Sequence, residues 1–146
     1  MLDEDGSGSF SDIADAVEWA TEQGTDAINM SLGGSSGSST LKNAVEYAYN
    51  NGVYVVAAAG NDGLCSDCVG YPAAYDECVA VSALDENEDL ATFSSTGTEV
   101  EIAAPGADVL STTTADRGGY EQLSGTSMAT PVVAGVAGLP GGAFGD

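Results

Sequence analysis

Two apolar runs constrain the fold of this chain more than any other feature of its sequence. Residues 53–59 read Val-Tyr-Val-Val-Ala-Ala-Ala, and residues 78–84 read Cys-Val-Ala-Val-Ser-Ala-Leu. Continuous apolar runs of this length are typical of strands in a parallel sheet that is covered on both faces. Residues 26–31, Asp-Ala-Ile-Asn-Met-Ser, predict a shorter buried strand before them.

Two segments with helical periodicity alternate with these strands, and each predicts one apolar face. In residues 11–23 the inward positions are Ile13, Ala16, Val17 and Ala20. The outward positions of that segment are Asp12, Asp15, Glu18 and Glu22. In residues 39–50 the inward positions are Leu41, Ala44, Val45 and Ala48. The order helix, strand, helix, strand, loop, strand predicts the α/β class, with three α/β/α layers around a mostly parallel sheet.

Beyond residue 90 the pattern changes to short strands and turns. Three short strands are predicted at residues 100–103, 109–112 and 120–124. A last apolar helix begins at residues 125–126 and must end by Leu139, because Pro140 and the two glycines after it cannot continue it. A length of 146 residues is enough for one domain with a core.

The charge of the chain limits its environment and its partners. There are 23 acidic residues and two basic ones, Lys42 and Arg117, so the formal net charge is −21. Repulsion of this size opposes the compact state, and salt screens it over about 10 Å at 0.1 M and about 3 Å at 1 M. We interpret the chain as halophilic; an ordinary acidic secreted enzyme is the alternative. Nucleic acid and membranes are not expected partners, because the chain has neither a basic patch nor an apolar run of about 18 residues.

Three cysteines, Cys65, Cys68 and Cys78, lie in one short stretch. A zinc site needs a fourth ligand, and in a chain without histidine only a carboxylate or water could supply it. We therefore expect one disulfide that staples the loop at residues 61–78, with one cysteine left over. The sequence leaves the pairing open, and it predicts no metal or cofactor in this chain.

The N-terminal segment imitates the start of a calcium-binding EF-hand loop. Asp3, Asp5 and Ser7 fall at loop positions 1, 3 and 5, and Gly8 falls at the sharp turn. The twelfth position is Ala14, where such a loop needs a bidentate glutamate. We interpret the segment as a solvated acidic turn that leads into the first helix.

Residues 123–139 carry the predicted chemistry. Ser127 lies where a loop enters the last helix, and the free N–H groups at a helix N-terminus stabilise an oxyanion that forms beside it. Pro131 removes the amide that would otherwise bond to the carbonyl of Ser127. On these grounds alone, an N-capping serine on a packing helix is the favoured interpretation.

A family resemblance reverses that preference. Residues 125–131, Gly-Thr-Ser-Met-Ala-Thr-Pro, closely resemble the signature of the subtilisin-like serine proteases (subtilases, peptidase family S8). Residues 28–34 resemble the family's substrate-binding strand, and residues 55–63 resemble the segment with its oxyanion-hole asparagine. The similarity covers residues 2–139, and the acidic character resembles that of the salt-loving halolysins.

The resemblance implies a role for each matching residue. Ser127 would attack the scissile carbonyl of a polypeptide, while the Asn61 side chain and the Ser127 N–H would hold the oxyanion. Without the resemblance, Asn61 would be a turn residue. The residues implied to pair with the extended peptide as an added strand are Ser31, Leu32, Gly33 and Gly34. Those implied to form a wall of the pocket for the side chain before the cut, which would accept a fairly large apolar group, are Ala58, Ala59 and Gly60.

The chain also departs from the family. A complete subtilase has an Asp-x-Gly strand and a His-Gly-Thr helix before the segments seen here, and this chain has no histidine to take the serine proton. We therefore expect residues 1–139 to be a partial catalytic domain that lacks its N-terminal half and is inactive alone. Residues 140–146 are expected to be a truncated or foreign tail. Val132 replaces a family histidine and is expected to pack in the core.

For the full-length protein, the resemblance implies an extracellular serine endopeptidase that cuts polypeptides by an acyl-enzyme mechanism and allows calcium as a ligand. The alternative function is a catalytically dead subtilase-like module that serves as a binding surface or scaffold. The upstream reading frame distinguishes the two, because a dead relative would lack the aspartate and the histidine of the triad.

Overall fold

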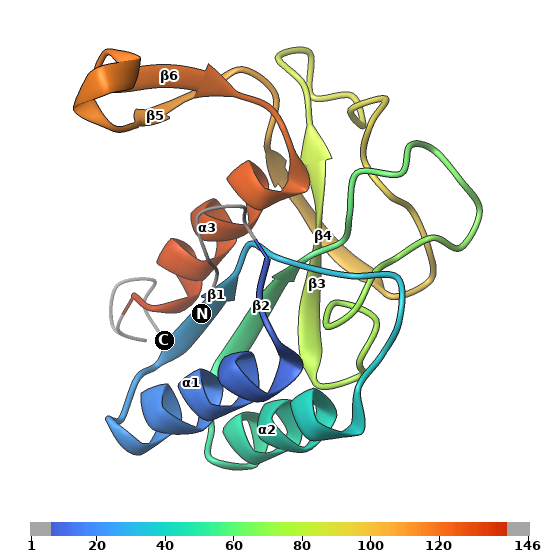
Figure 1. The fold of residues 1–146 in the computed structure, drawn as a ribbon. Helices are drawn as coiled ribbons and strands as arrows, with labels where there is room; N and C mark the ends of the chain where they lie inside the picture. The colour runs from blue at the N-terminus through green and yellow to red at the C-terminus, as the bar shows by residue number, and fades with distance from the viewer. Residues whose placement is uncertain (1–6, 140–146) are drawn as a thin grey trace.

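A computed structural model describes residues 7–139 (Figure 1). The predicted tail at 140–146 and the acidic positions Asp3 and Asp5 lie outside these residues. The elements in chain order are α1 (Phe10–Glu22), β1 (Ala27–Met30), α2 (Ser39–Asn50), β2 (Tyr54–Ala58), β3 (Cys78–Leu84), β4 (Val100–Pro105), β5 (Val109–Thr112), the 3-10 helix η1 (Ala115–Arg117), β6 (Tyr120–Leu123) and α3 (Thr126–Ala137). The structure thus has every helix and strand that the sequence predicted, with ends that agree or differ by one or two residues.

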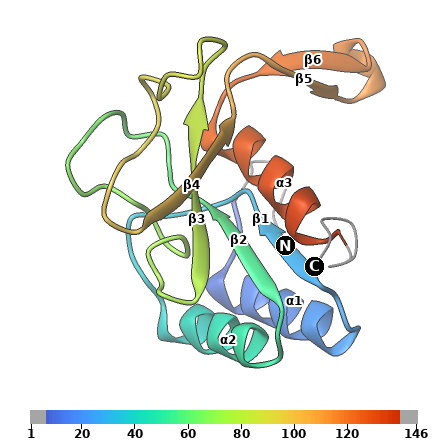
Figure 2. The same cartoon turned by 180° about the vertical axis from the view of Figure 1, so that it is seen from behind.

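Strands β1 to β4 form one parallel sheet in the order β1-β2-β3-β4. Strands β5 and β6 pair antiparallel as a separate hairpin. Helices α1 and α2 cover one face of the sheet and α3 covers the other (Figures 1 and 2). The predicted three-layer α/β/α architecture is therefore confirmed.

The central strands are buried on both faces, as their apolar runs predicted. Side chains alternate along β2, so that Val55 packs in the cluster under α1 and α2, while Val56 packs in the cluster under α3. Both side chains are almost completely buried. On the α1 and α2 side the core also includes the whole predicted inward face of α2, namely Leu41, Ala44, Val45 and Ala48.

Helix α1 corrects the predicted inward face by about one residue. Ile13 and Val17 are buried as expected, and the buried face also includes Ala14 and Thr21. The expected positions Ala16 and Ala20 are only partly buried. Burial of Thr21 is tolerated because its hydroxyl donates a hydrogen bond of 2.8 Å to the carbonyl of Val17.

The outer side of α3 corrects a second expectation. Ala129 is fully buried against the sheet, and Val133 packs against the same cluster. Val132 was expected in the core, but its exposed fraction is 44%, and that of Val136 is 53%. Among residues 7–139 nothing buries this side of the helix.

The three cysteines divide as expected into one disulfide and one free thiol. Cys65 is bonded to Cys68, and Cys78 is free and buried at the start of β3. Burial raises the pKa of the Cys78 thiol to about 12, and the nearby carboxylates of Glu77 and Glu101 add to this rise. Residues 7–139 contain no cluster of three or more His, Cys, Asp or Glu side chains that could hold a metal ion. No helix in the same range is long and apolar enough to cross a bilayer.

Candidate active site

The candidate site forms where two strands end and one helix begins. The carboxyl ends of parallel strands lie at the same edge of a sheet, so the segments after β1 and β2 are brought together there. The first segment contains Ser31 and the second contains Asn61. The N-terminus of α3 lies beside both and contributes Thr126 and Ser127.

Ser31 and Ser127 are joined by two hydrogen bonds. The Ser127 hydroxyl donates to the Ser31 carbonyl at 3.3 Å, and the Ser31 hydroxyl donates to the Ser127 carbonyl at 2.8 Å. The second bond uses the carbonyl that Pro131 leaves without its helical donor. The sequence predicted that this carbonyl would be released, but it gave no signal for its new partner.

Asn61 is oriented by Thr126. Its Oδ1 accepts the Thr126 N–H at 2.9 Å and the Thr126 hydroxyl at 3.1 Å. Because a backbone N–H can only donate, the side-chain atom that faces it is the amide oxygen. The amide nitrogen of Asn61 is therefore the end that is left to donate to a ligand. Thr126 itself is fully buried, which makes it a rigid support.

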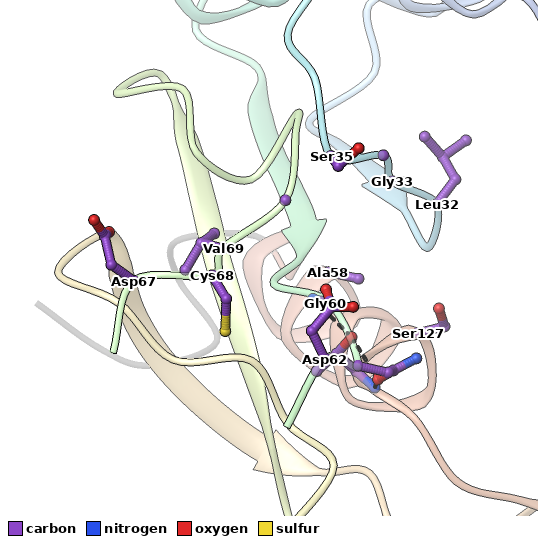
Figure 3. A pocket seen from close by; sticks show the side chains of 14 residues that line it. Leu32, Gly33, Ser35, Ala58, Gly60, Asp62, Asp67, Cys68, Val69 and Ser127 are labelled. Atoms are coloured by element: carbon purple, nitrogen blue, oxygen red, sulfur yellow. Dashed lines mark hydrogen bonds between the residues drawn. The ribbon is translucent and has the colours of Figure 1, made fainter. Parts of the chain in front are cut away.

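A cavity of about 580 Å³ lies over these residues (Figure 3). In Figure 3, Ser127 lies on one side of the cavity, Leu32 and Gly33 on a second, and Val69 and Cys68 across from Ser127. The predicted site residues that line the cavity are Asn61, Ser127, Leu32, Gly33, Gly34, Ala58 and Gly60. The lining residues that sequence reasoning missed are Ser35, Asp62, Asp67, Cys68, Val69, Gly70 and Thr126.

Two predicted residues lie outside the lining of this cavity. Ser31 contacts Ser127 directly, as described above. Ala59 is fully buried, and both of its main-chain groups are bonded: its N–H donates to Val81 of β3, and its carbonyl accepts from Gly70 in the loop before β3. Ala59 thus supports the pocket wall and does not form its surface.

Gly34 lines the cavity, but its main-chain N–H and C=O are both hydrogen bonded within this chain. Its N–H donates to the Tyr71 carbonyl at 2.9 Å, and its carbonyl accepts the Tyr71 N–H at 2.8 Å. This antiparallel bridge uses the groups that an added strand would need. Both main-chain hydrogen-bonding groups of Gly34 are thus occupied within this chain, and its pairing with a peptide stays a prediction.

The arrangement brings together the Ser127 hydroxyl, the Asn61 carboxamide and a helix N-terminus. These are the parts that stabilise charge on oxygen during acyl transfer. The Ser127 hydroxyl hydrogen bonds to a carbonyl oxygen, which does not take up a proton at neutral pH. The chain contains no histidine that could take this proton.

Comparison with known proteins shows the family and the fold of this chain. A sequence model of the subtilase family matches residues 1–144. Halolysin from Haloferax mediterranei is 64% identical over 138 residues, which are 94% of this chain and 26% of halolysin. Subtilisin DY from Bacillus licheniformis is 52% identical over 141 residues, or 95% of this chain and 51% of that protein. The solved S41 psychrophilic protease superposes with a TM-score of 0.87 at 45% identity, over 94% of this chain and 52% of that one.

The chain thus spans about half of the length of subtilisin DY and of the S41 protease, and about a quarter of the length of halolysin. The match to the family model includes every residue that lines the cavity and the whole of α3. With nearly the full chain matched in sequence and in fold, this protein belongs to the subtilase family.

Proposed function

We propose that this chain carries the nucleophile and the oxyanion hole of an extracellular serine endopeptidase. The observation that carries the proposal is that Ser127 and Asn61 line one cavity although 66 positions separate them, and that Thr126 links the two. A serine that only caps a helix and an asparagine that only forms a turn would not be expected to line the same cavity. An extracellular location and polypeptide substrates are proposed from the family and from its secreted members.

In this proposal Ser127 Oγ attacks the carbonyl carbon of the scissile peptide bond. A C–O bond forms, the carbonyl π electrons move onto oxygen, and the hydroxyl proton passes to a histidine of the rest of the domain. The Asn61 amide and the Ser127 N–H donate to the oxyanion. The C–N bond then breaks, the proton moves to the leaving amine, and water later hydrolyses the acyl-enzyme.

The substrate is held by its backbone in this scheme. Ser31, Leu32 and Gly33 continue from β1 and offer main-chain groups to an extended peptide. The cavity wall formed by Ala58 and Gly60 leaves room for the side chain before the cut. A volume of about 580 Å³ is ample for one side chain together with part of the peptide backbone.

The missing base makes the 146-residue chain inactive by itself. In subtilisin, loss of the histidine costs on the order of 10⁶ in kcat. We propose that the histidine and the aspartate belong to the missing half of the domain. Calcium binding by the longer protein stays a prediction, and no step above uses a metal.

The test is to complete the domain. The N-terminus of this chain is joined to the part of Haloferax mediterranei halolysin that precedes the region similar to this chain. The product is called the completed domain. Cleavage of a chromogenic peptide and labelling by a fluorophosphonate are measured at high salt. We expect activity and labelling in the completed domain, and neither in the 146-residue chain or in the Ser127→Ala completed domain.

A folded completed domain that neither cleaves nor is labelled would support the scaffold alternative. Labelling that persists in the Ser127→Ala protein would show that another residue is the nucleophile. Asn61→Ala is expected to lower kcat on the order of 10²–10³, the effect known for loss of one oxyanion-hole donor in subtilisin.

A further inference from the structure

Ser95 is a buried residue next to the site that the proposed chemistry does not use. It lies in the connection between β3 and β4, and its exposed fraction is 0%. It does not line the cavity that contains Ser127. Its contacts nevertheless lead directly to Asn61.

Ser95 bonds to the chain on both sides of Asn61. Its N–H donates to the carbonyl of Gly60 at 2.9 Å. Its hydroxyl accepts the N–H of Asp62 at 3.1 Å. Because the backbone on each side of Asn61 is held by the same residue, movement of Asn61 is restrained from both directions.

Ser95 is itself fixed to the core. Its carbonyl accepts a hydrogen bond of 3.2 Å from the hydroxyl of Ser82, a buried residue of the central strand β3. The neighbouring Ser94 bonds to β3 as well, where its hydroxyl accepts the N–H of Ala83 at 3.0 Å. The segment that carries Asn61 is thus tied, through Ser95, to the most buried part of the sheet.

The contact also explains why residue 60 is a glycine. A Cβ on Gly60 would lie 2.8 Å from Ser95 Oγ, closer than side-chain atoms approach one another. The φ angle of Gly60 is +119°, which side chains other than hydrogen disfavour. The main chain therefore curves closely around the Ser95 hydroxyl.

We infer that Ser95 is a positioning residue for the oxyanion hole. Its hydrogen bonds to Gly60 and Asp62 fix the backbone on both sides of Asn61, while Thr126 donates to the Asn61 Oδ1. Together these contacts set the direction of the Asn61 amide. Ser95 touches neither substrate nor reacting atoms in this scheme. The inference rests on the proposed role of Asn61.

The experiment compares Ser95→Ala with Ser94→Ala in the completed domain. Both serines are fully buried and each hydroxyl accepts one backbone N–H. The Ser94 hydroxyl also donates to the Ser95 carbonyl at 3.4 Å, so Ser94→Ala removes a similar group together with that one contact to Ser95. Only Ser95 contacts the segment that carries Asn61. We expect Ser95→Ala to lower kcat about 10-fold with KM within about 2-fold of the original, because a misplaced donor loses part of its effect on the transition state. Ser94→Ala should lower the melting temperature by a similar amount with little change in kcat.

A double-mutant cycle with Asn61→Ala separates a positioning role from general destabilisation. If Ser95 acts through Asn61, Ser95→Ala has no further effect on kcat once Asn61 is alanine. Equal effects in both backgrounds would overturn the inference and leave the oxyanion-hole proposal intact. If Asn61→Ala leaves kcat unchanged, the oxyanion-hole proposal fails and takes the inference with it.

Ser95→Cys keeps the buried volume similar if Ser95→Ala does not fold. The thiol is a weaker hydrogen-bond acceptor than the hydroxyl, so kcat should fall, by less than with alanine. Ser94→Cys is its control. A Ser95→Cys protein with the same kcat as the Ser94→Cys protein would contradict the inference.

Discussion

Helices α1 and α3 lie on opposite faces of the same sheet, and they differ in what they show to the outside. The outward side of α1 carries the acidic residues Asp12, Asp15, Glu18 and Glu22. Helix α3 contains no charged residue, and its outer side exposes Val132 and Val136. A helix that is apolar on all sides is normally buried. In a chain with a net charge of −21, the exposed side of α3 thus stands out as uncharged and apolar.

The two sides of the sheet therefore differ in what their helices leave exposed. The face under α1 and α2 is sealed, and Leu41 and Val45 there are fully buried. The core under α3 is buried as well, but among the described residues nothing covers the outer side of α3 or the outer edge of β1. Since the chain spans about half the length of subtilisin DY, we propose that further residues of a longer protein cover α3 and the edge of β1. The predictions below test this difference between the faces.

The largest expected effect concerns salt. At 0.1 M salt, repulsion among acidic groups and the exposed apolar side of α3 should together abolish cooperative unfolding of the 146-residue chain. At 1 M salt the repulsion is screened, and cooperative unfolding should return. Circular dichroism during heating and sedimentation velocity would measure this. Replacing the four acidic residues of α1 by their amides should weaken the dependence on salt. A cooperative transition in dilute buffer would contradict the prediction.

The next effect compares one residue from each face at 1 M salt. Leu41→Ala removes a fully buried side chain from the sealed face and should cost about 2–5 kcal/mol of unfolding free energy. Val136→Ala removes a half-exposed side chain from α3 and should cost less than about 0.5 kcal/mol. Urea unfolding measures both values. Equal costs would mean that α3 is as well buried in solution as α2.

The sealed face is also where sequence reasoning succeeded best. The bounds and the buried face of α2 were predicted in full, because Leu41, Ala44, Val45 and Ala48 recur at strict helical spacing. The inward face of α1 was predicted with an error of about one residue, because alanines on several sides of the helix leave its rotation undetermined. The exposure of Val132 was not predicted, since an apolar residue gives no sign that its partner is missing.

The sequence indicated half of the residues that line the candidate cavity, and it gave no sign of the contacts that hold them. The family motif indicated Ser127 and Asn61, and the structure places both on one cavity. The bond from Ser31 to the Ser127 carbonyl and the support of Asn61 by Ser95 are tertiary contacts between distant segments. No local pattern encodes them, because serine is common in loops for many other reasons.

A smaller effect concerns the free thiol of the sealed face. The pKa of Cys78 is raised by burial from 9.0 to about 12, so the folded state disfavours the thiolate. Its contribution to stability is complete below pH 9 and is lost as the pH rises from 9 to 12. At pH 10 the loss is about 1.4 kcal/mol relative to neutral pH. Denaturant unfolding of the chain and of Cys78→Ala at pH 7 and pH 10 would measure it, since only the original protein has this thiol. The same pH dependence in both proteins would contradict the prediction.

The smallest expected change in unfolding free energy is that of Val136→Ser in the 146-residue chain, and it should become larger in the completed domain. Val136→Ser on the open side of α3 replaces a half-exposed apolar group by a hydroxyl, which should change the unfolding free energy of the 146-residue chain by less than about 0.5 kcal/mol. If the missing half covers α3, the same substitution in the completed domain buries a hydroxyl without a matched partner and should cost about 1–3 kcal/mol. Thr113→Ser, in the hairpin connection after β5, is a control that should cost little in both proteins. A cost at Val136 that stays small in the completed domain would show that this side of α3 also faces solvent there, and the contrast between α1 and α3 would then need another cause.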